Sequence, residues 1–323
     1  MKVTACARFE LDELRTELST LRQILSFVTS EPEEFLNNLA GSDILVFMNE
    51  LYSEELARRL RVEAPSVKLI QLLTAGFDKL EKFGVPQNVT VATAGDSRSA
   101  AVAEHVIALM LALCECLPEA ADLQARKHWD EQFKRTVGTL IGQRLLIVGL
   151  GSIGTEIALR AKPFGMSIVG INRSGISPVE GVQAIAAAEL HAALPEADFI
   201  VIALPSEAST RRLIGEREFG LMKKGAFLVN VARGDILDQN ALLAALSDGV
   251  VAGAALDVVE GEPLNSDSLL WTAPNLILTP HMGGFAGETG RKCLARNVAE
   301  NLRRYVEGEQ LKWTASVRLT PGT

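Results

Sequence analysis

The chain has 323 residues, of which 48% are hydrophobic and 22% charged, and its formal net charge at pH 7 is −8. This length suits two domains or one large α/β unit, and the composition is that of a globular protein with a sizeable core. The acidic balance and the lack of a basic run argue against binding to nucleic acid or to an anionic membrane surface.

The N-terminus, the apolar runs and the cysteines indicate the compartment of the protein. The first twenty residues carry several charges and no apolar core, so no secretory signal is expected. The longest apolar run, residues 106–114, is far shorter than the roughly 20 residues of a membrane span. Four cysteines occur without C-x-x-C spacing: Cys6, Cys114, Cys116 and Cys293. We therefore predict reduced, structural thiols in a cytoplasmic protein and no metal site.

Short β-branched runs alternate with helical patterns twice along the chain. The first series predicts strands near residues 2–7, 24–28, 43–48, 67–73 and 89–93, with helical segments such as residues 53–64 between them. The second series predicts strands near residues 144–149, 167–172, 198–204, 225–232, 251–258 and 275–280. Near-continuous apolar strands separated by helices indicate parallel sheets covered on both faces.

Two predicted helices lie where the two series meet. Residues 98–117 are apolar nearly all round, which is typical of a helix buried between domains. Residues 286–307 form a second helical segment, which would return the chain to the first domain.

A G-x-G-x-x-G sequence begins at Gly149, directly after one predicted strand and directly before a helix. Gly149 allows a tight turn, Gly151 lets the backbone approach a pyrophosphate, and Gly154 lets the helix pack closely on the strand. The free N–H groups of the first helical turn, which includes Ser152 and Ile153, attract phosphate charge. The strand–turn–helix setting favours a dinucleotide site over a purely structural glycine turn.

The end of the next predicted strand indicates which dinucleotide is bound. Dinucleotide folds place an acidic residue there to receive the ribose 2′-hydroxyl, and its charge repels a 2′-phosphate. This chain has Asn172, Arg173 and Ser174 instead, a set suited to hold a phosphate dianion. We therefore predict NADP in preference to NAD. In the alternative interpretation, Arg173 stacks on the adenine or points to solvent.

Three further residues follow strands in the same half: Arg233, Glu262 and His281. An arginine can bind a carboxylate bidentately and polarise a carbonyl, and a histidine can exchange a proton near neutral pH. A carboxylate bonded to the second ring nitrogen would orient the imidazole and favour its charged form. Alone, each fits a solvated cap, a turn or a loop. Together, downstream of a dinucleotide loop, they predict reduction of a 2-keto acid.

With these motifs the sequence resembles the D-isomer-specific 2-hydroxyacid dehydrogenase family. The matching blocks lie within residues 69–284 and include "AVAEHVIALMLAL", "LLIVGLGSIG", "LVNVARGDILDQNALLAAL", "GAALDVVEGEPL" and "LILTPHMGG". The resemblance implies an α/β fold of two Rossmann-like, doubly wound parallel-sheet domains with a cleft between them. Residues 1–100 with 291–323 would bind substrate, and residues 101–290 would bind the dinucleotide.

The resemblance also implies roles for individual residues. Arg233 would anchor the substrate, Glu262 would partner the histidine, and His281 would be the acid/base. The backbone of three residues would bind the substrate carboxylate: Thr74, Ala75 and Gly76. Asp257 would meet the nicotinamide amide, and further cofactor contacts would come from Leu204, Pro205, Val231 and Gly283. The two glycines after Met282 would leave room beside His281 for the ring and the substrate.

Two expectations about partners follow from the resemblance, and two alternative functions stay open. The substrate is expected to be a small anionic 2-keto or 2-hydroxy acid such as glyoxylate or hydroxypyruvate. A homodimer is expected on the helix at residues 98–117. One alternative is a non-enzymatic corepressor of the same fold, which binds dinucleotide and recruits partners. The other is a formate or phosphite dehydrogenase, against which Glu262 argues, because formate dehydrogenases of this fold generally carry glutamine there.

Overall fold

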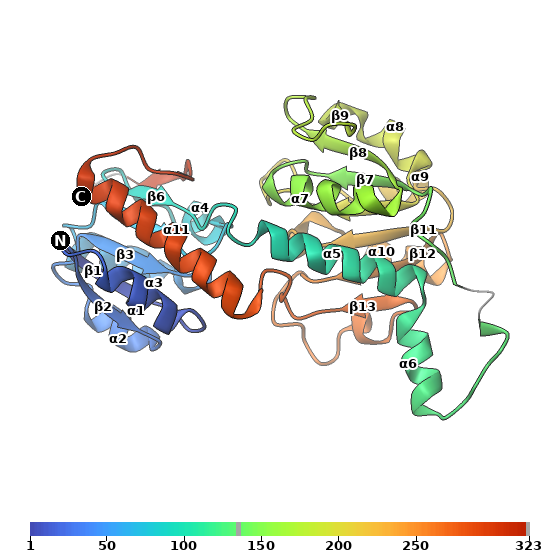
Figure 1. The fold of residues 1–323 in the computed structure, drawn as a ribbon, viewed down its shortest axis with the longest axis horizontal. Coiled ribbons are helices and arrows are strands. Elements are labelled where there is room, and N and C mark those ends of the chain that lie inside the picture. Colours follow the sequence, from blue (N-terminus) through green and yellow to red (C-terminus); the bar gives the residue numbers. More distant parts are fainter. Residues whose placement is uncertain (134–136, 321–323) are drawn as a thin grey trace. The chain divides into compact units, whose positions relative to one another are not determined.

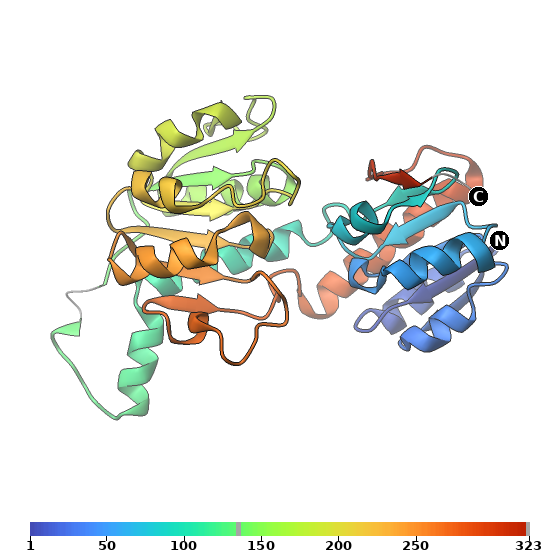
Figure 2. The same cartoon turned by 180° about the vertical axis from the view of Figure 1, so that it is seen from behind.

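The computed structural model describes residues 1–133 and 137–320, and the chain divides into two compact units (Figures 1 and 2). Unit 1 comprises Met1–Arg98 and Phe285–Thr323, and unit 2 comprises Ser99–Gly284. The boundaries predicted from the sequence lie a few residues later, after residues 100 and 290. The roles assigned to the two units stay predictions.

Unit 1 contains a five-stranded parallel sheet in the order β2-β1-β3-β4-β6. Alternate strand residues face opposite sides, as the two-residue period of a strand requires. Val3 and Ile44 face α1 and α11, whereas Leu45 and Ile70 face α2, α3 and α4. The strands are β1 (Lys2–Cys6), β2 (Leu25–Thr29), β3 (Ile44–Phe47), β4 (Leu69–Leu72) and β6 (Thr90–Ala92), and the helices are α1 (Leu11–Ser19), α2 (Pro32–Asn37), α3 (Glu54–Glu63), α4 (Asp78–Phe83) and α11 (Gly287–Glu307).

Unit 2 is built on a seven-stranded parallel sheet in the order β13-β12-β11-β10-β7-β8-β9. Helices α5 and α7 cover one face, and α8, α9 and α10 cover the other (Figure 1). The strands are β7 (Arg144–Val148), β8 (Ser167–Asn172), β9 (Gln183–Ala186), β10 (Phe199–Ile202), β11 (Ala226–Asn230), β12 (Val251–Leu256) and β13 (Leu276–Leu278), and the helices are α5 (Ser99–Cys114), α6 (Leu117–Ala125), α7 (Ser152–Ala161), α8 (Leu190–Ala193), α9 (Glu216–Leu221) and α10 (Gln239–Ser247).

The predicted fold class is confirmed, and the differences in detail have local causes. The helix expected over residues 98–117 ends at Cys114, because Cys116 adopts a left-handed φ of 52° and Pro118 lies in the first turn of the separate helix α6. The edge strand β9 was not predicted, since its residues are half-buried or exposed and lack a continuous apolar run. The small pair of β5 (Val85–Pro86) and β14 (Leu319–Thr320) was also not predicted.

Among the described residues, no single helix is long and apolar enough to cross a membrane. Helices α5 and α6 pass that test only when they are taken together across a 63° bend.

Candidate active site

The glycine-rich turn lies between β7 and α7, at the edge of the sheet where parallel strands place their ligands. Gly149 has a φ of 114°, and a Cβ there would lie 2.5 Å from the Ala203 carbonyl oxygen. A Cβ at Gly154 would lie 2.2 Å from the Gly149 carbonyl oxygen, so both positions require glycine. A Cβ at Gly151 would instead meet open space.

The first turn of α7 directs its backbone donors away from the helix. The first hydrogen bond along the helix runs from Thr155 N–H to the Gly151 carbonyl at 2.8 Å. The N–H groups of Ser152 and Ile153 precede it, and in a helix such groups have no partner in the same helix. An open cradle at Gly151 with donors at a helix N-terminus fits a pyrophosphate. The residues present therefore suit a dinucleotide.

His281 and Glu262 form a direct pair. His281 Nδ1 donates to Glu262 Oε2 over 2.7 Å, and the second oxygen, Oε1, accepts from Val259 N–H over 3.1 Å. The hydrogen bond to Glu262 raises the pKa of His281 above its ordinary value, against the opposing effect of burial. Burial works to raise the pKa of Glu262, but the bond from His281 and its charge lower it overall. The pair therefore favours an imidazolium beside a carboxylate, which leaves the Nε2–H of His281 as a proton donor.

Arg233 lies close enough to this pair for its charge to act on both members. Its positive charge lowers the pKa of His281 and of Glu262. A close backbone contact accounts for this placement: a Cβ at Gly234 would lie 2.0 Å from the Val259 carbonyl carbon, so only glycine lets the turn after β11 pack on the loop after β12. Arg233 Nη1 also donates to the Ala232 carbonyl over 2.7 Å. The structure thus brings together the three residues predicted to be catalytic.

Asp257 organises the loop that carries His281. This carboxylate is only 3% exposed. Its Oδ1 accepts from Thr279 Oγ1 at 2.6 Å and from Met282 N–H at 2.9 Å, and its Oδ2 accepts from Gly283 N–H at 2.9 Å. Burial works to raise the pKa of Asp257, but the nearby His105 ring and the hydrogen bonds from Thr279, Gly283 and Met282 lower it overall. With these bonds in place, His281 stands in the left-handed region at a φ of 53°.

His105 on α5 anchors the same network. Its Nε2 lies 3.1 Å from Thr279 Oγ1 and 3.4 Å from Asp257 Oδ1. Because Thr279 gives its proton to Asp257, its oxygen accepts from His105 Nε2–H. This role of His105 was not predicted from the sequence.

The structure gives a packing reason for the glycine at position 283. A Cβ there would lie 2.9 Å from Asp257 Oδ2 and 3.0 Å from His105 Cδ2. Gly283 is therefore required by the close approach of Asp257 and His105, and the room that it leaves for a substrate stays a prediction. Its predicted cofactor contact stays a prediction.

The loop after β8 is ordered by Asn172. Its Oδ1 accepts from Gly175 N–H at 2.7 Å and from Ser174 Oγ at 3.3 Å, and its Nδ2 donates to the Ile176 carbonyl at 2.8 Å. Arg173 is 84% exposed and pairs with Glu207, with 2.6 Å between Nη2 and Oε1. This partner was not predicted.

The remaining predicted residues divide between the two units. Leu204 and Pro205 follow β10, and the buried Val231 follows β11, all at the edge of the unit 2 sheet that carries the glycine-rich turn. Thr74, Ala75 and Gly76 follow β4 in unit 1, where Thr74 Oγ1 donates to the Gly76 carbonyl over 2.9 Å. The substrate contacts of these three residues stay predictions.

The comparisons with known proteins decide the family. A family model described as "D-isomer specific 2-hydroxyacid dehydrogenase, NAD binding domain" matches residues 107–283, more than half of the chain. The chain belongs to this family. The family predicted from the sequence is confirmed, and so is its general activity: the chain is an oxidoreductase of 2-hydroxy acids that uses a nicotinamide dinucleotide.

Individual relatives of this dehydrogenase support the same family assignment. It is 35% identical to D-3-phosphoglycerate dehydrogenase of Methanocaldococcus jannaschii over 86% of its own length, but spans only 52% of that protein. It is 33% identical to glyoxylate reductase of Pyrococcus furiosus, covering 86% of its own length and 83% of that protein. A crystal structure of a D-isomer specific 2-hydroxyacid dehydrogenase family protein from Aeromonas salmonicida subsp. salmonicida superposes with a TM-score of 0.86 at 28% identity, covering 98% of both chains.

Proposed function

We propose that this dehydrogenase reduces a small 2-keto acid, such as glyoxylate or hydroxypyruvate, with NADP preferred over NAD. When bound, the reduced nicotinamide supplies a hydride to the carbonyl carbon. Glyoxylate is named here because a glyoxylate reductase is among the relatives that the chain matches over most of their length.

Arg233, Glu262 and His281 would perform the protein's part of this reaction. The guanidinium of Arg233 would bind the substrate carboxylate and polarise the neighbouring carbonyl. His281 would donate the Nε2 proton to the oxygen that becomes the hydroxyl. Glu262 would hold the ring by its Nδ1–H and keep it charged before the proton is given up. The observation that carries the proposal is the 2.7 Å pair of His281 and Glu262 under the charge of Arg233.

The cofactor preference rests on the loop after β8. An ordered turn at Asn172 presents a guanidinium and a hydroxyl where NAD-specific dinucleotide folds carry an acid. We expect the catalytic efficiency with NADPH to exceed that with NADH, and Arg173→Ala to lower this ratio, mainly through a higher KM for NADPH. A parent enzyme that prefers NADH, or an unchanged ratio in the variant, would overturn this assignment.

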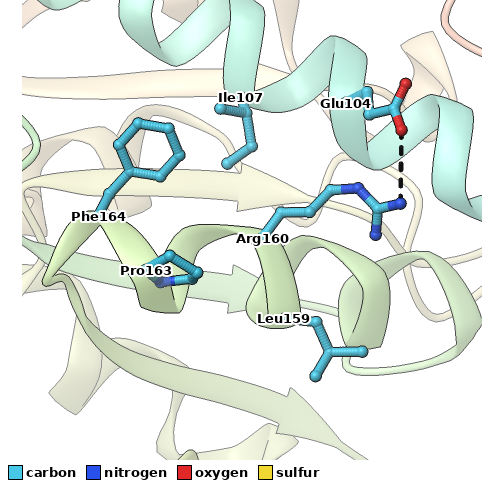
Figure 3. Close-up of a pocket in the computed structure, with 6 residues that line it drawn as sticks. All are labelled: Glu104, Ile107, Leu159, Arg160, Pro163 and Phe164. Carbon is cyan, nitrogen blue, oxygen red and sulfur yellow. Dashed lines mark ion pairs between the residues drawn. The ribbon is translucent and has the colours of Figure 1, made fainter.

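We further propose a homodimer in the cytoplasm. The surface between α5 and α7 has a hollow of about 420 Å³ lined by Glu104, Ile107, Leu159, Arg160, Pro163 and Phe164 (Figure 3). It shares no residue with the catalytic set or the glycine turn. Its lining is mainly apolar apart from the Glu104–Arg160 ion pair, which supports contact with a second copy through α5. Sedimentation of the purified chain should give a dimer, and a monomer at micromolar concentration would contradict the proposal.

A keto-acid panel tests the proposed reaction. The purified chain is mixed with NADPH or NADH and with glyoxylate, hydroxypyruvate, pyruvate or phenylpyruvate, and absorbance at the nicotinamide band is followed. We expect turnover with glyoxylate, with hydroxypyruvate or with both. No turnover across the panel, with cofactor binding intact, would favour the corepressor-like alternative.

A further inference from the structure

The Arg173–Glu207 ion pair lies at the edge of the unit 2 sheet that carries the glycine-rich turn. Arg173 directly follows β8, and Glu207 lies in the turn after β10. These strands flank β7, whose end carries the glycine-rich turn, and all three run parallel. Because the carboxyl ends of parallel strands share one edge, the pair stands beside the position predicted for the dinucleotide.

Glu207 is held in place by its own turn. Its N–H donates to Thr210 Oγ1 at 2.7 Å, and its carbonyl accepts from Thr210 N–H at 3.0 Å and from Arg211 N–H at 3.1 Å. Arg211 itself pairs with Asp235 at 3.4 Å, so the nearest cation in sequence is directed elsewhere. The Glu207 carboxylate is therefore presented to Arg173 by an ordered backbone.

Arg173 lies within the turn that Asn172 closes through its bonds to Gly175 and Ile176. A ribose 2′-phosphate bound by Arg173 needs the guanidinium N–H groups, and Glu207 already accepts from Nη2. The Glu207 carboxylate would also repel the phosphate dianion, whereas it can accept a hydrogen bond from a ribose hydroxyl. Specificity often depends on such a repulsive element.

Resting on the proposed function, we propose that Glu207 is a specificity-determining residue that weakens binding of NADP relative to NAD. Many dinucleotide folds have an acidic residue at the end of the strand that corresponds to β8, where it repels a 2′-phosphate. Glu207 would have the same effect from the loop after β10. The cofactor preference is then a balance of two residues: Arg173 attracts the 2′-phosphate, and Glu207 competes for Arg173 and repels the phosphate.

The test measures the binding of adenosine 2′,5′-bisphosphate, which carries the 2′-phosphate, and of ADP, which lacks it, to the full chain by calorimetry. In Glu207→Gln, the ratio of the Kd for the bisphosphate to the Kd for ADP should fall by roughly 1.5- to 5-fold, the range for an exposed, screened charge. The fall in this ratio caused by Glu207→Gln should be smaller when Arg173 is already alanine. The double variant Arg173→Ala/Glu207→Gln is therefore compared with Arg173→Ala, in which there is no Arg173 for Glu207 to compete for.

Glu180→Gln is the matched control, since it changes the net charge equally. Its carbonyl accepts from Lys162 Nζ, just beyond the C-terminus of α7, which places it about one helix length, ~15 Å, from the glycine-rich turn. Equal effects of Glu180→Gln and Glu207→Gln, or an unchanged ratio in Glu207→Gln, would overturn the role of Glu207. If neither nucleotide bound to the parent chain or to any variant, both the proposed cofactor site and the role of Glu207 would be contradicted. Binding with the expected ratio but without keto-acid turnover would support Glu207 while contradicting the proposed reaction.

Discussion

The loop of His281 and the loop of Arg173 stand at the same edge of one sheet, yet their polar groups are organised differently. Asp257, which holds the His281 loop, is 3% exposed and accepts from a hydroxyl and two backbone N–H groups. Arg173 is 84% exposed and has its ion pair with Glu207 at the surface. A buried, fully bonded carboxylate fixes geometry, whereas a solvated ion pair contributes little to stability and is screened by salt.

The difference separates two tasks. Proton transfer requires atoms held within hydrogen-bond reach, so the network around Asp257 leaves His281 little freedom. Cofactor selection requires only a difference in affinity, so exposed side chains suffice. Substitutions in the first region should therefore cost much in turnover or stability, and those in the second should cost little and affect mainly KM.

The largest effect is expected from His281→Asn. Asparagine tolerates the left-handed φ of 53° but cannot donate a proton as imidazolium does, so the loop should persist without its acid. We expect kcat to fall by about 10²- to 10⁴-fold, the usual contribution of general acid catalysis. Cofactor binding measured by fluorescence serves as the control for folding. Retention of more than about a tenth of the parent kcat would break the assignment of His281 as the acid.

Arg233→Lys should come next. Lysine keeps the charge but loses the planar fork, so both keto-acid affinity and turnover should fall. The loss of one charge-assisted hydrogen bond corresponds to roughly 10- to 150-fold in kcat/KM. Steady-state kinetics with every accepted acid test this expectation, and parent-like values throughout would place the substrate anchor elsewhere.

Gly283→Ala probes the packing of the His281 loop. The added Cβ would lie 2.9 Å from Asp257 Oδ2, so the loop must shift, at a cost of about 1–3 kcal/mol in the free energy of unfolding. Gly220→Ala in α9 is the matched control, because a Cβ there meets open space and alanine favours a helix. Urea unfolding should separate the two variants, and equal stabilities would show that the network around Asp257 is looser than described.

Asn172→Ala should give the smallest effect. It removes three exposed bonds that order the loop of Arg173, each worth roughly 0.5–1.5 kcal/mol at most. The KM for NADPH should rise by roughly 2- to 10-fold, with a smaller change in kcat. A fall in kcat as large as that of His281→Asn would erase the contrast between the two loops.

The alternation of apolar strands and helices along the chain could be predicted from the sequence. Continuous apolar runs marked the buried strands, and the glycine-rich turn was identified because it lies between a strand and a helix. Arg233, Glu262 and His281 were found because each follows a strand of the same parallel sheet. The edge strand β9 lacked that signal, since neither of its faces is fully buried.

Contacts that depend on distant segments could not be predicted in the same way. His105 and Thr279 are 174 residues apart in sequence, and only the packing of α5 against the sheet brings them together. The pair of Arg173 and Glu207 becomes visible once β8 and β10 are known to flank β7. Gly234 carried a usable signal, because a glycine next to a catalytic arginine indicates a close backbone approach.

The pH dependence of Glu262→Gln tests the central claim most directly. Reduction requires protonated His281, so its rate falls as pH rises through the pKa of that residue. Glu262 raises this pKa through a hydrogen bond and its charge, and glutamine would retain at most the hydrogen bond. The account predicts that the alkaline limb of kcat/KM for reduction moves to lower pH in the variant, with cofactor binding retained. An unchanged pH–rate profile would contradict the pairing of Glu262 with His281.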